Sequence, residues 1–285
     1  MTFSDYLQQQ HLSEGSIRTY SNYLLEYTKW LAQEELTEAN FTYNDVLDYM
    51  RHLKITGRSA GTVRSLLNVI RHYGHFLIDQ GARQDNPAAG LYVRGFIRKL
   101  PTNLLGAQEM EQLYQQYSLQ LNVDVGKKAM LGLMIYQGMT VTELVHLEGR
   151  HIWIKEQKVL IRAGQQGVER VLPLHAAQLS ILGECLQEQR RKGGPLFMRV
   201  TKNVISKRNI GNRIKHMISQ ARQLNGRLLS AKQIRSSVIT HWLRNNDLRQ
   251  VQYMAGHKYV SSTERYQLNH LDDLQGEVNR HHPMR

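Results

Sequence analysis

The stretch that decides the fold is 243-LRNNDLRQVQYMAGHKYVSSTERYQ-267, close to the C-terminus. It is rich in arginine, and it places the tripeptide Ala255-Gly256-His257 just ahead of Tyr266, which follows the histidine by nine residues. A tyrosine near a chain end ordinarily packs on a terminal helix, whereas a tyrosine held beside histidine and arginine can act as a nucleophile. The remainder of the chain decides between these two interpretations.

Composition bounds the class of protein. With 285 residues and 41% hydrophobic content, the chain can bury a proper core and form two domains. The single cysteine, Cys185, allows neither a disulfide within the chain nor a cysteine-based metal site, which fits a reducing compartment. The first residues do not resemble a signal peptide, and no run of about eighteen apolar residues occurs. The sequence therefore predicts a folded, cytoplasmic protein that spans no membrane.

The positive charge is concentrated in the second part of the chain. Residues 1–95 carry 9 Lys and Arg against 10 Asp and Glu, which is a net charge of −1. The net charge of the whole chain is +13, so residues 96–285 carry a net charge of +14. A cationic surface of this strength attracts polyanions, and nucleic acid is the commonest polyanion in a cytoplasm. A solubilising or membrane-binding surface is the alternative, because charge alone is not specific.

The first third of the sequence has the apolar spacing of amphipathic helices, which together indicate a small helical domain. The predicted helices are residues 13–32 with Ser13 as N-cap, residues 42–53 opened by Thr42 or Asn44, and residues 59–81 ended by Gly81.

The helical pattern breaks at 85-DNPAAGLYVRGFIRKLPTNLL-105, which contains two prolines and a cluster of basic residues. We interpret this break as an interdomain linker. The predicted organisation is a helical domain over residues 1–88, a linker over 89–104 and a second domain over 105–285.

The second domain is predicted to be mostly helical with one small sheet. Residues 106–117 and 127–139 have helical spacing, after which 151-HIWIKEQKVLIRAGQQGVERVLPL-174 alternates apolar and polar residues around glycines. Alternation of this kind is typical of an antiparallel hairpin or a three-stranded sheet. Helical periodicity returns from Asn209, Ser230, Arg249 and Leu271. The fold class is therefore mainly α with a small antiparallel β-sheet.

The order of the motifs resembles that of the tyrosine recombinases, also called phage integrases, and among them the short Xer-like type. The resemblance covers nearly the whole chain, and the box around Tyr266 is its most specific part. The motifs that carry it are Asn86-Pro87, Gly138-Met-Thr-Val-Thr-Glu-Leu144, Glu169-Arg-Val-Leu-Pro-Leu174, Lys232-Gln-Ile-Arg235, Ala255-Gly-His257 and Tyr266.

This resemblance implies both a fold and a reaction. A SAM-like, core-binding helical domain would precede a tyrosine recombinase catalytic domain. The tyrosine would attack a DNA phosphate, giving a 3′-phosphotyrosyl link and a free 5′-hydroxyl without metal or other cofactor. Arginines and a histidine would steady the phosphate, and a lysine in the hairpin would protonate the leaving oxygen. The resemblance assigns these roles to Tyr266 as nucleophile and to Arg235 and His257 as phosphate ligands.

Three positions depart from the family pattern. Thr140 stands where the family has its first arginine, Gln165 where the hairpin lysine is expected, and Lys232 where a histidine usually opens the second box. A threonine hydroxyl cannot neutralise a phosphate as a bidentate guanidinium does. Loss of such a group with no replacement would raise the free-energy barrier of the reaction by about 3–4 kcal/mol, which slows it roughly 10²–10³-fold. Lys232 and Arg235, at positions i and i+3, are predicted to share one helical face. Lys232 brings a cation and a proton donor, so it could cover part of the role of the histidine or of the missing hairpin lysine.

Other polar residues have weaker signals. Glu143 is predicted to be a structural carboxylate in an ion pair. Six basic residues are candidates for the DNA backbone, and a solvated face is the competing interpretation: Arg162, Lys202, Lys207, Arg208, Arg213 and Lys215. The thirteen histidines lack a ligand spacing, so no metal site is predicted.

Three functions compete on these observations. The first is a site-specific recombinase or integrase that binds double-stranded DNA and works as a tetramer, in which a C-terminal tail beginning near Leu274 reaches into a neighbouring subunit; a partner recombinase could take part. The second is a catalytically impaired accessory paralogue that holds DNA without cutting it. The third is a basic helical transcription regulator, which has no need for the spacing of His257 and Tyr266. Retention of Tyr266, Arg235 and His257 together favours the enzyme.

Overall fold

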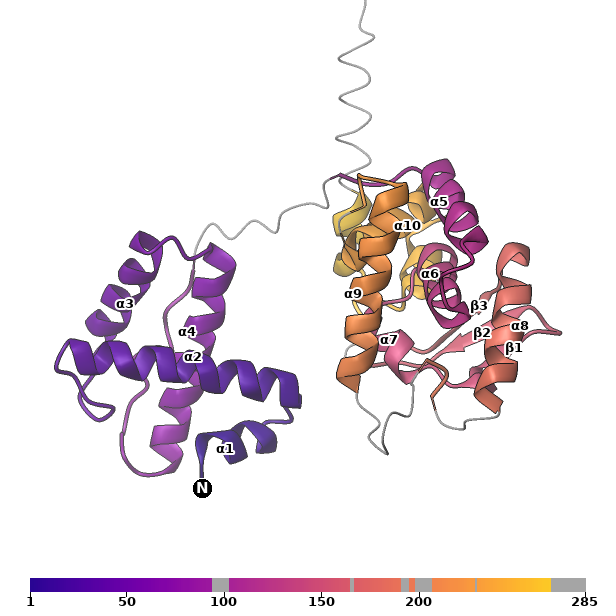
Figure 1. The fold of residues 1–285 in the computed structure, drawn as a ribbon. Helices are drawn as coiled ribbons and strands as arrows, with labels where there is room; N and C mark the ends of the chain where they lie inside the picture. The colour runs from indigo at the N-terminus through magenta and orange to yellow at the C-terminus, as the bar shows by residue number, and fades with distance from the viewer. Residues whose placement is uncertain (94–102, 165–166, 191–194, 198–206, 229, 268–285) are drawn as a thin grey trace, which may run out of the picture. The chain divides into compact units, whose positions relative to one another are not determined.

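The computed structural model describes residues 1–93, 103–164, 167–190, 195–197, 207–228 and 230–267. The chain forms two compact units, Met1–Arg98 and Lys99–Arg285 (Figure 1). Each unit has its own hydrophobic core. No helix in the described ranges is long and apolar enough to cross a membrane.

The first unit consists of four helices: α1 (Phe3–Gln9), α2 (Glu14–Gln33), α3 (Tyr43–Ile55) and α4 (Ala60–Asp79). The last three confirm the helices predicted from sequence, and each starts at a serine or threonine whose hydroxyl accepts a backbone hydrogen bond. Thr42, rather than Asn44, caps α3. Helix α1 was not predicted, because its seven residues are too few to show a periodic pattern; a capping box between Thr2 and Asp5 starts it.

The chain that leaves α4 stays packed on the first unit. The Asn86 side chain donates a hydrogen bond to the carbonyl of Arg71 at 2.9 Å and accepts one from the Ala88 amide at 3.1 Å. A Cβ at Gly74 would lie 2.3 Å from Asn86 Oδ1, so only glycine leaves room for this contact within α4. Leu91 is also buried in this core. Compact packing thus extends beyond residue 88, and residues 94–102 of the predicted linker lie outside the described ranges.

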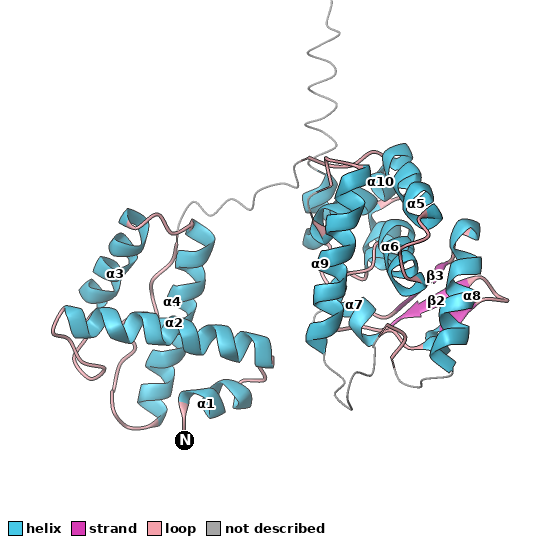
Figure 2. Ribbon diagram, in the orientation of Figure 1, coloured by secondary structure: helices cyan, strands magenta, loops and turns pink. Residues whose placement is uncertain are grey.

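The second unit is helical around one small sheet, as the sequence predicts (Figure 2). Strands β1, β2 and β3 form an antiparallel sheet in that order, with Ile152 paired to Val159 and Ile161 to Arg170. The elements are α5 (Ala107–Leu119), α6 (Val125–Gln137), α7 (Val141–His146), the 3₁₀-helix η1 (Gly149–His151), β1 (Ile152–Trp153), β2 (Lys158–Ile161), β3 (Arg170–Pro173), α8 (Ala176–Arg190), α9 (Lys207–Leu224), α10 (Ala231–Asn245) and α11 (Leu248–Ala255).

Helix α6 is the centre of this unit. Most of its side chains are buried, and α5, α8, α9 and α10 all pack against it (Figure 1). A helix that is apolar on every face is stable only when it is surrounded in this way. It ends at Gly138 in the left-handed conformation, with φ 57°. This turn leads directly into the motif at 138–144, so the core of the unit positions the first part of the site.

Candidate active site

Thr140 and Glu143 form the start of helix α7. The Thr140 amide and hydroxyl donate hydrogen bonds to Glu143 Oε2 at 2.7 Å and 2.9 Å, and the Glu143 amide donates to the Thr140 hydroxyl at 3.2 Å. This reciprocal arrangement is a capping box. The hydroxyl that stands at the position of the family's first arginine is therefore engaged in holding Glu143, and Thr140 brings no charge to the site.

Glu143 is an ion-pairing residue, as predicted, and it pairs with two arginines. Its Oε1 lies 2.6 Å from Nη1 of Arg170 in β3, and its Oε2 lies 3.8 Å from Nη1 of Arg235 in α10. Burial acts to raise the pKa of Glu143, but the hydrogen bond and charge of Arg170 and the charge of Arg235 outweigh it and lower the pKa. Glu143 is thus an ionised carboxylate between two guanidinium groups.

Arg235 joins three parts of the second unit. Besides Glu143, its guanidinium donates hydrogen bonds to the carbonyls of Gly138, at the end of α6, and Ala255, at the end of α11. Only 12% of the side chain is exposed. Because the two carbonyl partners fix the plane of the guanidinium, its position is set by helix ends that are far apart in sequence.

His257 and Tyr266 lie face to face. Helix α11 ends at Gly256, whose φ of 64° turns the chain sharply, and residues 261–267 are helical again. The two aromatic rings stack with centroids 6.1 Å apart and an interplanar angle of 12°. His257 Nδ1 lies 2.9 Å from the hydroxyl of buried Thr263, which orients the imidazole.

Tyr266 is also a packed aromatic. It is 6% exposed and belongs to a small apolar cluster with Ile239, Val251 and Ala255. The guanidinium carbon of Arg265 lies 5.3 Å from the centre of its ring. Packing and a role as nucleophile are therefore compatible for Tyr266. Its ring is held in an apolar cluster, and that cluster lies beside Arg235 and His257.

Burial and charge keep His257 neutral. Burial lowers the pKa of His257, and the charges of Arg235, Arg265 and Arg170 lower it further, to about 4. An unfolded histidine titrates near its ordinary value of 6.5. Between these values the unfolded chain binds a proton that the folded chain does not, so stability falls as pH falls through this window.

We therefore expect the wild-type protein to lose more stability than a His257→Gln variant between pH 7 and pH 5. Solvent still reaches part of the ring, so the difference should be about 1 kcal/mol. Urea unfolding of both proteins at the two pH values measures it, and the other histidines cancel in the comparison. An equal loss in both proteins would show that His257 is not held neutral by the fold.

The remaining predicted residues are distributed differently. Lys232 is exposed at the first turn of α10, whereas Arg235 points into the unit, so the predicted common face does not bring them to one point in this structure. Arg213 pairs with Asp124 at 2.6 Å and donates to the Phe197 carbonyl at 2.6 Å, which makes it a structural residue here. Arg162 and Lys215 are exposed. Gln165 and Lys202 and the side chains of Lys207 and Arg208 lie outside the described parts of the chain.

Arg170 is the site residue that sequence reasoning missed. It stands in the quoted box 169–174, but no role was assigned to it. In β3 the burial alternates, with Arg170 and Leu172 buried and Pro173 exposed. An arginine in the inward register of a strand was the available signal, because such a charge is rarely buried without a partner.

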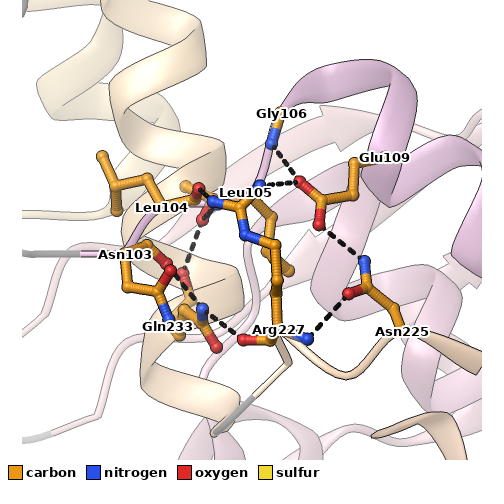
Figure 3. A network of polar contacts seen from close by, with 9 residues as sticks. Asn103, Leu104, Leu105, Gly106, Glu109, Asn225, Arg227 and Gln233 are labelled. Carbon is orange, nitrogen blue, oxygen red and sulfur yellow. Dashed lines mark hydrogen bonds and ion pairs between the residues drawn. The ribbon is translucent and has the colours of Figure 1, made fainter. Parts of the chain in front are cut away.

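The first turn of α10, which carries Lys232 and Arg235, is fastened to the chain just before α5 (Figure 3). Gln233 Nε2 donates to the carbonyls of Asn103 at 2.6 Å and Arg227 at 2.9 Å. The Arg227 guanidinium in turn donates to Glu109 at 2.9 Å and to the Leu104 carbonyl at 2.8 Å. These hydrogen bonds thus join the start of the second unit to α10, the helix that carries Arg235.

A buried hydrogen bond in this fastening can be tested. The Leu105 amide donates to the Ser237 hydroxyl at 2.9 Å, and both residues are buried. Ser237→Ala leaves this amide without a partner, so we expect a loss of about 1–3 kcal/mol in the free energy of unfolding, measured by urea denaturation. In the matched control Ser65→Ala, the lost bond is a local one to the Gly61 carbonyl in α4, and the change should stay below about 0.5 kcal/mol. Equal changes would mean that the Leu105 amide is not dependent on Ser237.

Among the residues that the structure describes, no group of three or more histidine, cysteine, aspartate or glutamate side chains could hold a metal ion. The arrangement instead offers two guanidinium groups, one carboxylate, a neutral imidazole and a phenol, which is a set suited to an anionic substrate and a tyrosine nucleophile.

Solved structures with the same fold include proteins bound to DNA. One is the XerH site-specific recombinase bound to palindromic difH substrate, with a TM-score of 0.69, 17% identity and coverage of 88% of this chain and 75% of that one. Another is a lambda integrase dimer bound to a COC′ core site, with a TM-score of 0.67, 16% identity and coverage of 93% and 92%. At these identities the likeness shows the fold alone.

Sequence comparison gives the family. Tyrosine recombinase XerD of Proteus mirabilis is 27% identical over 282 residues, 96% of this chain and 89% of the relative. Tyrosine recombinase XerC of Haemophilus influenzae is 29% identical over 285 residues, 98% and 95%. Residues 1–81 match the N-terminal SAM-like domain of phage integrases. Residues 103–273, more than half of the chain, match the model of the phage integrase family, and the chain therefore belongs to that family.

Proposed function

We propose that this protein is a Xer-like, site-specific tyrosine recombinase that breaks and rejoins double-stranded DNA through Tyr266. The observation that carries the proposal is that Tyr266 stacks on His257 beside the turn held by Arg235, which in turn lies next to the ionised Glu143. A protein that only binds DNA has no physical need for a phenol, an imidazole and a buried guanidinium at one point. DNA-bound structures among the neighbours, and relatives named as recombinases, support the same function.

The proposed reaction is a transesterification at phosphorus. The Tyr266 oxygen forms a bond to the phosphorus while the bond from phosphorus to the 5′ oxygen breaks, and the 3′ end stays attached to the tyrosine. The phenolic proton is released to water, and a proton donor supplies the leaving oxygen; Lys232, exposed at the start of α10, is our candidate donor. Arg235 and neutral His257 hydrogen-bond to the phosphate oxygens as charge develops there. The reverse of the same step rejoins a strand.

We further propose that the two units clamp one duplex and that four subunits act together, since four strands must be cut and rejoined. The proposed boundaries are residues 1–88 and 105–285 for the two domains. The basic residues Arg162, Lys202, Lys207, Arg208 and Lys215 are candidate contacts to the DNA backbone. The tail that would reach a neighbouring subunit, residues 268–285, lies outside the described ranges. Cytoplasmic location remains a prediction.

Trapping the covalent intermediate tests the function. Duplexes from both flanks of the gene would carry a nick near each candidate site, so that a short cleaved strand is lost and the protein stays attached. We expect a slow-migrating adduct on a denaturing gel and, after proteolysis, a nucleotide on the peptide that contains Tyr266. An adduct attached to another residue, or its absence from every duplex bound, would contradict the proposal. If an adduct formed only after Thr140→Arg and Gln165→Lys were installed, the protein would be an accessory DNA-binding paralogue.

A further inference from the structure

The guanidinium of Arg170 is buried with little to bind. Only 1% of the side chain is exposed, and its Nη1 bonds Glu143 at 2.6 Å. Within the described part of the chain, its Nε and Nη2 are buried and have no hydrogen-bond partner. Burying a guanidinium whose donors are partly unpaired costs free energy. A structural ion pair alone could be made at lower cost by a residue with fewer donors, so this arrangement requires a further explanation.

The balance of charge at the site depends on Arg170. Glu143 carries one negative charge, Arg235 one positive charge, and His257 is neutral at pH 7. Thr140 adds none. Without Arg170 these buried groups would be neutral together, and with it they have one net positive charge; Arg265, over the Tyr266 ring, adds a separate charge at the nucleophile. A site that must stabilise an increasingly negative phosphate needs that surplus.

The fold makes room for Arg170 directly behind the site. A Cβ on Gly256 would lie 2.4 Å from Arg170 Nη1 and 3.0 Å from its guanidinium carbon. The Gly256 carbonyl accepts a hydrogen bond from the Val168 amide at 3.1 Å, which joins the chain before β3 to the turn that carries His257. The glycine of the Ala255-Gly256-His257 box therefore has two functions: it adopts a left-handed turn, with φ 64°, and it leaves space for a guanidinium.

The charge of Arg170 reaches the groups that would face the phosphate. It acts on both Arg235 and His257, lowering the pKa of each after the larger effect of burial. Water does not screen a charge that is buried to this degree, so its field extends farther than that of a surface arginine. Direct contact with the substrate is not needed for such an effect.

We infer that Arg170 is an electrostatic positioning residue that supplies, from behind the site, the second positive charge that Thr140 does not provide. This inference rests on the proposed function, since it concerns the phosphate that Tyr266 would attack. It places a permanent positive charge in the hairpin strand β3, behind a site in which Thr140 provides none.

Cleavage of charged and neutral phosphates tests the inference. Nicked duplexes would carry either a normal phosphate or an uncharged methylphosphonate at the cleaved position. Arg170→Met should slow adduct formation on the phosphate about 10²-fold but on the methylphosphonate less than about threefold, because the neutral substrate does not need the charge. Arg170→Lys keeps the positive charge, so it should retain most of the wild-type rate of adduct formation on the charged phosphate. Equal losses of Arg170→Met on both substrates would show a purely structural role and overturn the inference.

A matched control separates charge from folding. Arg213→Met removes another ion pair, that of Arg213 with Asp124, whose side chains are 14% and 30% exposed. Arg213 also donates to the Phe197 carbonyl, and neither partner belongs to the site. Any loss in this variant should be the same on both substrates. If Arg170→Met does not fold, a Thr140→Arg variant of the otherwise unchanged chain tests the same inference. If Arg170 already supplies the charge, Thr140→Arg should speed adduct formation on the phosphate by less than about tenfold. A gain of about 10²–10³ would overturn the inference.

A measurement without DNA distinguishes failure of this inference from failure of the proposed function. If the wild-type protein forms no adduct on either duplex, the proposed function fails. The effect of the Arg170 charge on the site is then tested by measuring the pKa of His257 by NMR. We expect that pKa to rise in Arg170→Met and to stay near the wild-type value in Arg170→Lys. No rise in Arg170→Met would mean that its charge does not reach the site.

Discussion

A Tyr266→Phe protein should bind its duplex as tightly as the wild type and form no covalent adduct, a loss on the order of 10⁴-fold or more. The substitution removes one oxygen atom and leaves the ring. The ring can still stack on His257 and pack against Ile239, Val251 and Ala255. Fold and DNA binding should therefore survive, and only the group that attacks the phosphorus is lost. Adduct formation on nicked duplexes and affinity by gel shift measure the two properties separately.

Tyr259→Phe is the control for this experiment. Tyr259 is 64% exposed and lies outside the apolar cluster, with the Lys258 ammonium 5.6 Å from the centre of its ring. The same chemical change there should leave the adduct at the wild-type level. Persistence of the adduct in Tyr266→Phe would identify another nucleophile. Loss of DNA binding together with the adduct would instead assign Tyr266 a packing role only.

Replacing Glu143 by leucine should lower the free energy of unfolding by about 3–5 kcal/mol, because it leaves two buried arginines without their counter-ion. The side chains of Arg170 and Arg235 are 1% and 12% exposed, so water cannot replace the carboxylate. The substitution also removes the acceptor of the Thr140 amide at the start of α7. Urea unfolding at pH 7 measures the loss, and adduct formation should fall with it, since Arg170 would lose its ion pair and the start of α7 its capping carboxylate.

The control for this change is Glu148→Leu. Glu148 pairs with Arg150 at 2.7 Å, but 39% of its side chain and 67% of that of Arg150 are exposed. An exposed pair of this kind contributes about 0–1 kcal/mol, so its removal should have a small effect. If both variants lost the same stability, or if Glu143→Leu were more stable than the wild type, the buried triad would not hold the site together.

Local sequence determined most of the secondary structure. Ser13, Thr42, Ser59 and Ser230 each precede an apolar stripe with helical spacing, and each caps a helix in the structure. These signals are legible because a cap and a periodic stripe act within a few residues of one another. The alternating segment 151–174 likewise predicted the sheet. Helix α1 was missed because it is shorter than the window in which a period can be recognised.

Part of the candidate site was predictable for the same reason. His257 and Tyr266 are close in sequence, and a turn at Gly256 followed by one short helical segment is enough to bring their rings together. The position of Lys232 was not predictable in this way. Residues three apart on a helix are neighbours, but whether each faces the core or solvent depends on what the helix packs against, and here Arg235 is buried while Lys232 is exposed.

By itself, therefore, the sequence determined the fold class, the family motifs and the pairing of His257 with Tyr266. Only the tertiary structure decided how the charges are arranged. Glu143 meets Arg170 across 27 positions, and Arg235 meets the Gly138 carbonyl across 97. Contacts over such separations depend on the packing of α6, α10 and β3 around a common core, and no local pattern encodes them. The same packing buries the Arg170 guanidinium beneath Gly256.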